Sequence, residues 1–143
     1  MADGVSELGK AGKHRLDDAW SLINAVRWRG AMYLAGYSVE CLLKTKLMRM
    51  LDCRHLRELE EELIRRKALP TRTTVFTHQL EVLLRLTNAF DRLRQSEDHW
   101  RLFNRVNRWV PAWRYTADLS NKDDANDFLE AVKKVSLWIE HNI

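Results

Sequence analysis

The chain has 143 residues, of which 45% are hydrophobic and 31% are charged, with 24 Lys and Arg against 20 Asp and Glu. This composition excludes a disordered chain and fits one folded domain with a mildly basic surface. Only 5 Gly and 2 Pro occur, fewer than an all-β protein with many tight turns needs, so we expect helices joined by few loops.

The N-terminal quarter divides into a polar leader and a first helix. Residues 1–13 are polar and contain three glycines, so we expect a flexible leader ahead of a single domain over 14–143. Apolar residues then recur at spacings of three and four, which predicts an amphipathic helix over 14–27. Trp28–Gly30 is expected to interrupt it.

The run over 31–51 is the most apolar in the chain. Its apolar residues cover more than one face, which is typical of a central helix. Ala35 and Gly36 are small, and glycine costs up to about 1 kcal/mol against alanine inside a helix. We therefore expect a neighbouring helix to approach closely at this point.

The rest of the chain shows helical periodicity and no β-type alternation. We expect a charge-rich helix ending near Lys67, a loop over 68–77, a helix capped by Thr77 and continuing through Phe90 and Leu93, a helix from Ser96 that ends before Pro111, and a last helix beyond Asp124. The sequence thus predicts an all-α fold, namely an antiparallel up-and-down four-helix bundle with one or two additional short helices.

Three short pieces carry a resemblance to a known family. Residues 35–44 read AGYSVECLLK and resemble the signature helix of the HEPN (higher eukaryotes and prokaryotes nucleotide-binding) domain family. Residues 78–84 read HQLEVLL and are similar to the family's His-x-Leu-x-x-Leu helix. Arg114 and Tyr115, ahead of the last helix, are similar to its Arg-Tyr element, and the three pieces follow in the family's order.

The resemblance implies a bundle fold and, in many members, a homodimer. It also implies a pairing with a minimal nucleotidyltransferase as toxin and antitoxin. Many members are metal-independent ribonucleases with an Arg-x(4–6)-His motif, in which Arg stabilises the scissile phosphate and His polarises the ribose hydroxyl. No His follows Arg114 at that spacing here, so we expect binding rather than catalysis. Arg94 and His99 have the required spacing and are the weak catalytic candidates, with His99 otherwise an ordinary surface histidine.

A polar stripe runs along the predicted central helix. Its members follow one another at spacings of four, three and four and therefore share one face: Tyr33, Tyr37, Glu40 and Lys44. If the two charges are buried they must be satisfied, and Arg114 or Tyr115 could do this. The stripe is either an internal polar anchor or part of a small pocket for a nucleotide or phosphate. The candidate ligand-binding residues are Tyr37, Glu40, Lys44, Arg114 and Tyr115.

Arginines form a second stripe before Pro111. Arg101, Arg105 and Arg108 fall on one helical face, and tryptophans are interleaved with them. Such a pattern is typical of an RNA-binding groove, in which cations follow the phosphates and rings stack on bases. A solvated arginine face or a dimer interface would give the same pattern.

No apolar stretch is long enough to cross a membrane, and no secretory signal is evident, so we expect a cytoplasmic protein. No zinc, P-loop or nucleophile motif occurs, so we expect no cofactor and no metal. The leading hypothesis is a HEPN-like component of a toxin–antitoxin or defence pair that binds nucleotide, RNA or a partner protein. The alternatives are a HEPN ribonuclease using Arg94/His99 or Arg114, and a non-catalytic helical interaction module.

Overall fold

The computed structural model describes residues 4–115 and 120–143 and consists of helices, most of them joined by short connections, with a longer loop over residues 66–79 between α3 and α4. The elements are α1 (Val5–Asn24), α2 (Trp28–Met50), α3 (Leu56–Arg65), α4 (Leu80–Leu86), α5 (Phe90–Gln95), α6 (Glu97–Val106), the 3-10 helix η1 (Pro111–Tyr115) and α7 (Lys122–Asn142). An isolated bridge between Gly4 and His55 is the sole strand-like pairing in these ranges. The predicted all-α fold class is confirmed. None of the described helices combines the length and apolarity needed to span a bilayer.

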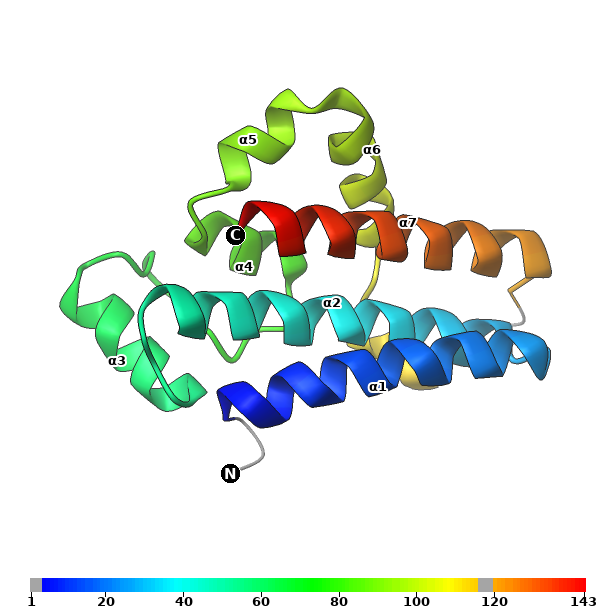
Figure 1. Ribbon diagram of the computed structural model, residues 1–143, viewed down its shortest axis with the longest axis horizontal. Helices are drawn as coiled ribbons and strands as arrows, with labels where there is room; N and C mark the ends of the chain where they lie inside the picture. The colour runs from blue at the N-terminus through cyan, green and yellow to red at the C-terminus, as the bar shows by residue number, and fades with distance from the viewer. Residues whose placement is uncertain (1–3, 116–119) are drawn as a thin grey trace.

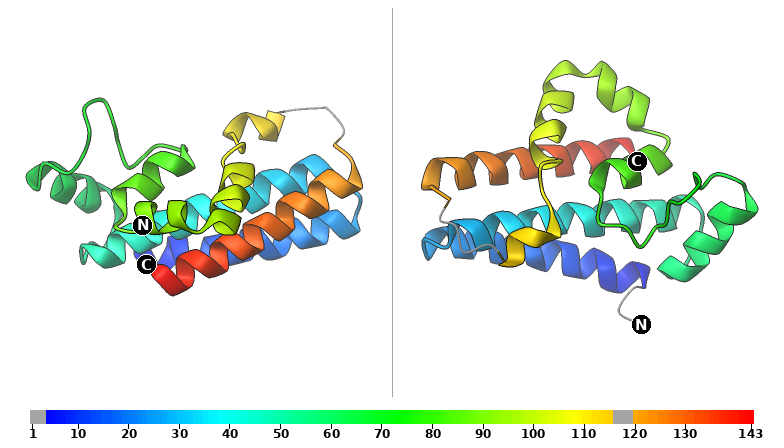
Figure 2. Two further views of the ribbon diagram at one scale, coloured as in Figure 1. Left: turned by 90° about the horizontal axis from the view of Figure 1, so that it is seen from above. Right: turned by 180° about the vertical axis from the view of Figure 1, so that it is seen from behind.

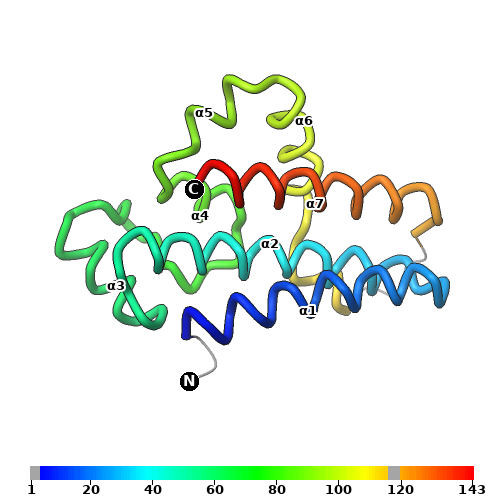
Figure 3. The backbone as a smooth tube through the Cα atoms, in the orientation of Figure 1, coloured from blue at the N-terminus to red at the C-terminus, as the bar shows by residue number. Residues whose placement is uncertain are grey.

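Three long helices, α1, α2 and α7, form the body of the molecule (Figure 1). α1 runs antiparallel to α2, whereas α7 runs in the same direction as α2 (Figure 3). α2 contacts both of the others, and the short helices α4 and α6 pack on α2 and α7 respectively. The third stretch of the expected up-and-down bundle is therefore not one long helix but the broken series from α4 to α6.

α2 has buried residues on all its faces, as its apolar sequence predicted. The buried polar side chains of this helix have hydrogen-bond or ion-pair partners: Ser38, Glu40, Lys44, Thr45 and Lys46. Lys46, for example, donates to Glu140 of α7 over 3.0 Å. This ion pair ties the C-terminal half of α2 to the C-terminal end of α7.

The predicted leader is largely helical, since α1 begins at Val5 rather than near residue 14. Leu8 and Gly12 are buried against α2, and the backbone N–H of Val5 donates to the carbonyl of Arg54 over 2.9 Å. The leader hypothesis rested on polar residues and glycines, but glycine here lets α1 pack closely on α2. A Cβ added at Gly12 would lie 3.0 Å from the Cβ of Cys41.

The break between α1 and α2 falls earlier than expected. Val26 adopts a left-handed backbone with φ 56°, and the N–H of Arg27 returns to the carbonyl of Leu22 over 2.8 Å. This is the hydrogen-bond pattern that ends many helices. Trp28–Gly30 consequently lies in the first turn of α2 rather than in a connection.

The helix predicted to run from Thr77 through Leu93 is two helices with a break after Leu86. The Thr87 hydroxyl donates to the carbonyl of Leu84 over 2.6 Å and accepts from the N–H of Ala89 over 3.2 Å. This threonine side chain offers the backbone an alternative to helical hydrogen bonds. The Thr77 hydroxyl accepts from the N–H of Gln79 ahead of α4, and Gln79 is the N-cap residue.

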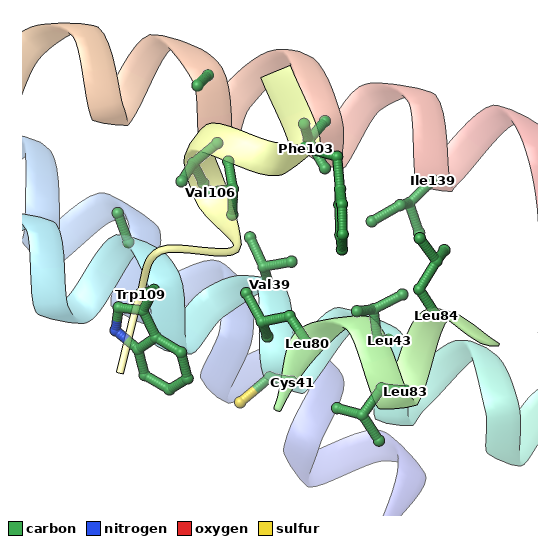
Figure 4. Packing of buried hydrophobic residues seen from close by; sticks show 14 of the residues in the cluster. Val39, Cys41, Leu43, Leu80, Leu83, Leu84, Phe103, Val106, Trp109 and Ile139 are labelled. Atoms are coloured by element: carbon green, nitrogen blue, oxygen red, sulfur yellow. The ribbon is translucent and has the colours of Figure 1, made fainter. Parts of the chain in front are cut away.

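The core lies where α4, α6 and α7 converge on side chains of α2 (Figure 4). Figure 4 shows apolar residues of α2, α4, α6 and α7 packed together, with Trp109 beside them. They include Val39, Leu43, Leu80, Leu83, Phe103 and Ile139. This packing holds the segments before α4 and after α6 against the same side of α2.

Candidate functional site

The polar stripe of α2 forms the base of the site. Tyr33 and Tyr37 lie parallel, with ring centroids 6.4 Å apart. Glu40 and Lys44 are 3% and 4% exposed, and Lys44 Nζ donates to Glu40 Oε2 over 3.1 Å. A buried ion pair needs further hydrogen bonds to offset the loss of hydration, so the second carboxylate oxygen of Glu40 requires its own partner.

That partner is His78, which immediately precedes α4. Its Nδ1 lies 2.8 Å from Glu40 Oε1, so Glu40 is held between Lys44 and His78. The sequence suggested Arg114 or Tyr115 for this role, but the segment ahead of α4 lies across α2 and brings His78 instead (Figure 2, right). A carboxylate that accepts at Nδ1 fixes the tautomer and leaves Nε2 of the ring for another partner.

A cleft of about 390 Å³ opens beside His78. Its lining comes from α1, α2, the segment before α4 and the segment from Trp109 into η1, which both lie against α2 (Figure 2, right). The lining residues are Arg15, Tyr33, Leu34, Tyr37, His78, Trp109, Pro111 and Arg114. The volume lies within the range of about 300–1,000 Å³ that is common for ligand pockets.

Arg114 carries its charge at the mouth of this cleft. Its guanidinium lies 5.8 Å from the ring centroid of Tyr33 and 4.8 Å from that of Tyr115, and its Nη2 donates to the Tyr115 hydroxyl over 2.8 Å. No carboxylate of the described chain pairs with it. Tyr115 itself is 78% exposed and does not line the cleft. Arg114 is thus a cation supported by aromatic rings and available to an anion.

Trp109 closes one side of the cleft and is itself buried. Its Nε1 donates to the carbonyl of Tyr33 over 2.9 Å, and its ring lies directly on Gly36. The close approach predicted at Gly36 is therefore made by this indole and not by a neighbouring helix. α2, Trp109 and Arg114 are thereby held in one arrangement.

Comparison of this chain with protein-family models, with curated proteins and with solved structures finds no match. The chemistry of the cleft is therefore read from its own side chains.

The cleft lining combines cations with aromatic rings, and none of the described residues contributes a carboxylate to it. Arg15 lines the cleft and forms a half-exposed ion pair at 3.2 Å with Asp18, which does not line it. Guanidinium groups bind phosphates in bidentate fashion, and tyrosine rings stack on bases. Among the described residues no group of His, Cys, Asp and Glu is arranged to hold a metal ion. The arrangement suits an anionic ligand with a flat ring.

Glu40 and Lys44, both predicted to bind ligand, lie beneath the cleft rather than in its lining. Glu40 and Lys44 pair with each other, and the second oxygen of Glu40 bonds to His78. They can influence a ligand through His78, because the Glu40 carboxylate orients that ring. Of the five residues predicted to bind ligand, the structure brings Tyr37 and Arg114 together in the lining.

The weak catalytic candidates lie elsewhere. His99 sits in the first turn of α6, where its Nδ1 is 2.8 Å from the Ser96 hydroxyl and its ring packs near Trp138. Arg94 lies at the end of α5 with its guanidinium 5.7 Å from the Phe90 ring. Neither residue lines the cleft, and no contact joins the two.

Arg101 and Arg105 lie on the exposed side of α6, opposite buried Phe103, but Arg108 lies in the turn that follows the helix, so the predicted stripe of three is not one helical face. Arg101 lies 3.5 Å from Asp98, whereas Arg105 and Arg108 have no ion pair within the described ranges. α6 leads directly into Trp109 of the cleft wall. RNA contact by this stripe stays a prediction.

Five lining residues belong neither to the predicted polar stripe nor to the predicted ligand-binding residues, and three of them carry polar or aromatic groups: Arg15, His78 and Trp109. Arg15 lies in α1, and the spacing of residues in the sequence does not predict which side of α1 contacts α2. His78 belongs to the HEPN-like stretch 78–84, but nothing in that stretch indicates that its side chain meets Glu40. The useful signal was the buried Glu40, since a buried carboxylate needs a second donor and His78 follows a loop long enough to return to α2.

The raised pKa values of Tyr37 and Cys41 predict a loss of stability at alkaline pH. Burial raises the pKa of the Tyr37 phenol to about 12, and burial with the nearby Glu40 charge raises the pKa of the Cys41 thiol to about 11. Both groups hold their protons more tightly in the folded state, so this stability is complete below about pH 9 and is lost as the pH rises toward 11–12. Urea unfolding at a series of pH values measures the loss.

The matched control is the variant Tyr37→Phe/Cys41→Ala, which cannot ionise at either position. Its free energy of unfolding should fall less steeply above pH 9 than that of the wild type. Equal slopes for the two proteins would show that other groups cause the alkaline loss.

Proposed function

We propose that this chain is a HEPN-like protein that binds a nucleotide, or one nucleotide unit of single-stranded RNA, in the cleft between α2, His78 and η1. The observation that carries the proposal is the lining itself, in which the described part of the chain places two arginines, a histidine and three aromatic rings but no carboxylate. An acidic lining would repel phosphate, whereas this one concentrates positive charge beside stacking surfaces. Arg114 is the main phosphate ligand, and Tyr33 and Tyr37 are the rings against which a base stacks.

The wider biological setting of this proposal rests on the resemblance of residues 35–44, 78–84 and 114–115 to the HEPN family. On that basis the protein acts in the cytoplasm as a homodimer and forms one half of a toxin–antitoxin or defence pair with a minimal nucleotidyltransferase. A nucleotide-binding cleft is compatible with this setting. A helical interaction module that binds no nucleotide is the competing proposal.

A second candidate function is RNA cleavage, and one observation favours it. His78 is bonded through Nδ1 to the buried Glu40 and is 57% exposed at its side chain, beside Arg114 in the lining. A histidine held in this way can take the proton of a ribose hydroxyl at Nε2, while a guanidinium stabilises the charge that develops on the phosphate. In this form the ribonuclease proposal uses His78 and Arg114, not Arg94 and His99.

Binding of ATP and of a fluorescein-labelled eight-nucleotide RNA, at two salt concentrations, tests the proposal. Arg114→Ala should weaken binding of both probes by about tenfold, and should reduce the salt dependence of RNA binding by about one phosphate contact. Arg57→Ala is the matched control, since Arg57 is exposed on α3 and does not line the cleft. If Arg114→Ala and Arg57→Ala bind both probes equally well, the cleft is not the binding site.

Gel analysis of the same RNA after incubation separates binding from cleavage. Cleavage that disappears in His78→Gln while binding persists would establish the second function. RNA that stays intact in the wild type would remove it. Cleavage that is lost in His99→Ala but kept in His78→Gln would show that His99 of α6, and not His78, is the catalytic histidine.

A further inference from the structure

A second and larger hollow, of about 660 Å³, lies on a different face of the molecule. It is a groove bounded by α1, α2, α7 and the turn between α2 and α3. Figure 1 shows α1, α2 and α7 from the side that α4–α6 leave uncovered. The groove shares no lining residue with the cleft, so it is a separate candidate site.

The shape of the groove follows from one face of α2. Ser38, Leu42, Thr45 and Arg49 succeed one another at spacings of four, three and four and all line it. Opposite them, α1 contributes lining residues from Val5 to Leu16, including two glycines. Eleven helical steps span about 16 Å, which is the length of a three-turn helix.

The floor of the groove is mostly apolar, and the two hydroxyl side chains in it already donate hydrogen bonds within α2. The Ser38 hydroxyl donates to the carbonyl of Ala35 over 2.5 Å, and the Thr45 hydroxyl donates to that of Cys41 over 2.7 Å. Leu16 and Leu42 are partly exposed between them. An occupant therefore has to present apolar side chains to this floor.

The rim of the groove is basic. Lys10, Lys13 and Arg49 have no ion-pair partner among the described residues, and Arg54 is paired with Glu58 at 3.3 Å. Two acidic side chains, Asp52 and Glu140, also line the groove. Glu140 is already paired with Lys46. The charge left unpaired along the rim is predominantly positive.

We propose that this groove docks an acidic amphipathic helix, about three turns long, from a partner protein. The occupant is a helix because the walls are helices whose backbone groups are satisfied internally, so an extended peptide would find no hydrogen-bond partners for its own backbone. Its apolar face covers Leu16 and Leu42. Its carboxylates face Lys10, Lys13 and Arg49 across the rim.

A second copy of this chain fits the groove less well. A two-fold contact of groove with groove would bring the same lysines and arginines together, which is unfavourable. The acidic helix α3 is also committed within its own chain, since Glu62 pairs with Arg65 and Arg66, and Glu58 with Arg54. The partner therefore supplies its own carboxylates.

The test uses the whole chain and a designed twelve-residue helical peptide, labelled with fluorescein, with Leu at positions 1, 5, 8 and 12 and Glu at the flanking positions. A second peptide has the same leucines but Lys in place of Glu. The acidic peptide should bind at least tenfold more tightly than the basic one, as measured by fluorescence anisotropy. Equal binding of the two peptides would overturn the proposal.

Charge reversal locates the binding. Lys10→Glu/Lys13→Glu should weaken binding of the acidic peptide by at least tenfold, whereas Arg101→Glu/Arg105→Glu on α6 changes the net charge equally and should have little effect. Circular dichroism checks that both variants fold. Equal loss in both variants would mean attraction by overall charge and would contradict the proposal. A dimer that sedimentation detects for the wild type and not for Lys10→Glu/Lys13→Glu would also contradict it, because a second copy would then be the occupant.

Discussion

Glu40→Ala should destabilise the protein by about 3–5 kcal/mol, since it removes one partner of a buried ion pair and leaves Lys44 charged and unpaired in the core. The midpoint of thermal unfolding should fall by on the order of 10 °C for a chain of this length. Urea or thermal unfolding followed by circular dichroism measures the effect. His78 should also lose its fixed position, because its Nδ1 partner is gone.

The double variant Glu40→Leu/Lys44→Met is the control that separates a buried charge from a lost contact. Replacing both charges by apolar side chains of similar size should recover most of the stability, as is common when a whole buried pair is replaced. If the double variant is as unstable as Glu40→Ala, then packing or the His78 contact, and not the stranded Lys44 charge, is responsible. Binding of ATP to the double variant reports what His78 orientation contributes to the cleft.

Gly36→Ala should destabilise the protein by about 1–3 kcal/mol although alanine is the better helix former. The added methyl group would overlap the five-membered ring of Trp109, whose other contacts fix it in place. Trp109 would have to leave its position and give up its hydrogen bond to the carbonyl of Tyr33. Because Trp109 also forms a wall of the cleft, binding of ATP should weaken in the same variant.

Gly30→Ala is the matched control, because it makes the same change in the same helix at an exposed position. A Cβ there meets only Leu22 Cδ1, at 3.4 Å. We expect this variant to be at least as stable as the wild type, with unchanged tryptophan fluorescence. If Gly36→Ala matched it in both stability and fluorescence, close packing of Trp109 on α2 would be contradicted.

The fold class followed from local information in the sequence. Scarce glycine and proline and helical spacing of apolar residues predict helices, and these signals depend on neighbours within a few positions. The central place of α2 followed in the same way, from its lack of a polar face. Where the predicted helix boundaries were wrong, individual contacts set the observed boundaries. Packing of Gly12 on Cys41 makes part of the supposed leader helical, and the hydroxyl of Thr87 divides one predicted helix into two.

The residues of the cleft were only partly accessible from the sequence. The spacing of Tyr33, Tyr37, Glu40 and Lys44 places them on one face of a helix, and this face is observed. Their partners come from residues 38 to 76 positions away along the chain, such as His78 for Glu40 and Trp109 for Tyr33. Periodicity carries no information about contacts over such separations.

Helical structure, the central position of α2 and the polar stripe along it can all be predicted from the sequence, because each depends on side-chain spacing within one helix. Which side chains meet that stripe depends on how distant segments of the chain pack. Burial of Glu40 demands two donors, and the way the chain returns to α2 before α4 and after α6 decides that Lys44 and His78 supply them and that Arg114 lines the cleft without a carboxylate partner among the described residues.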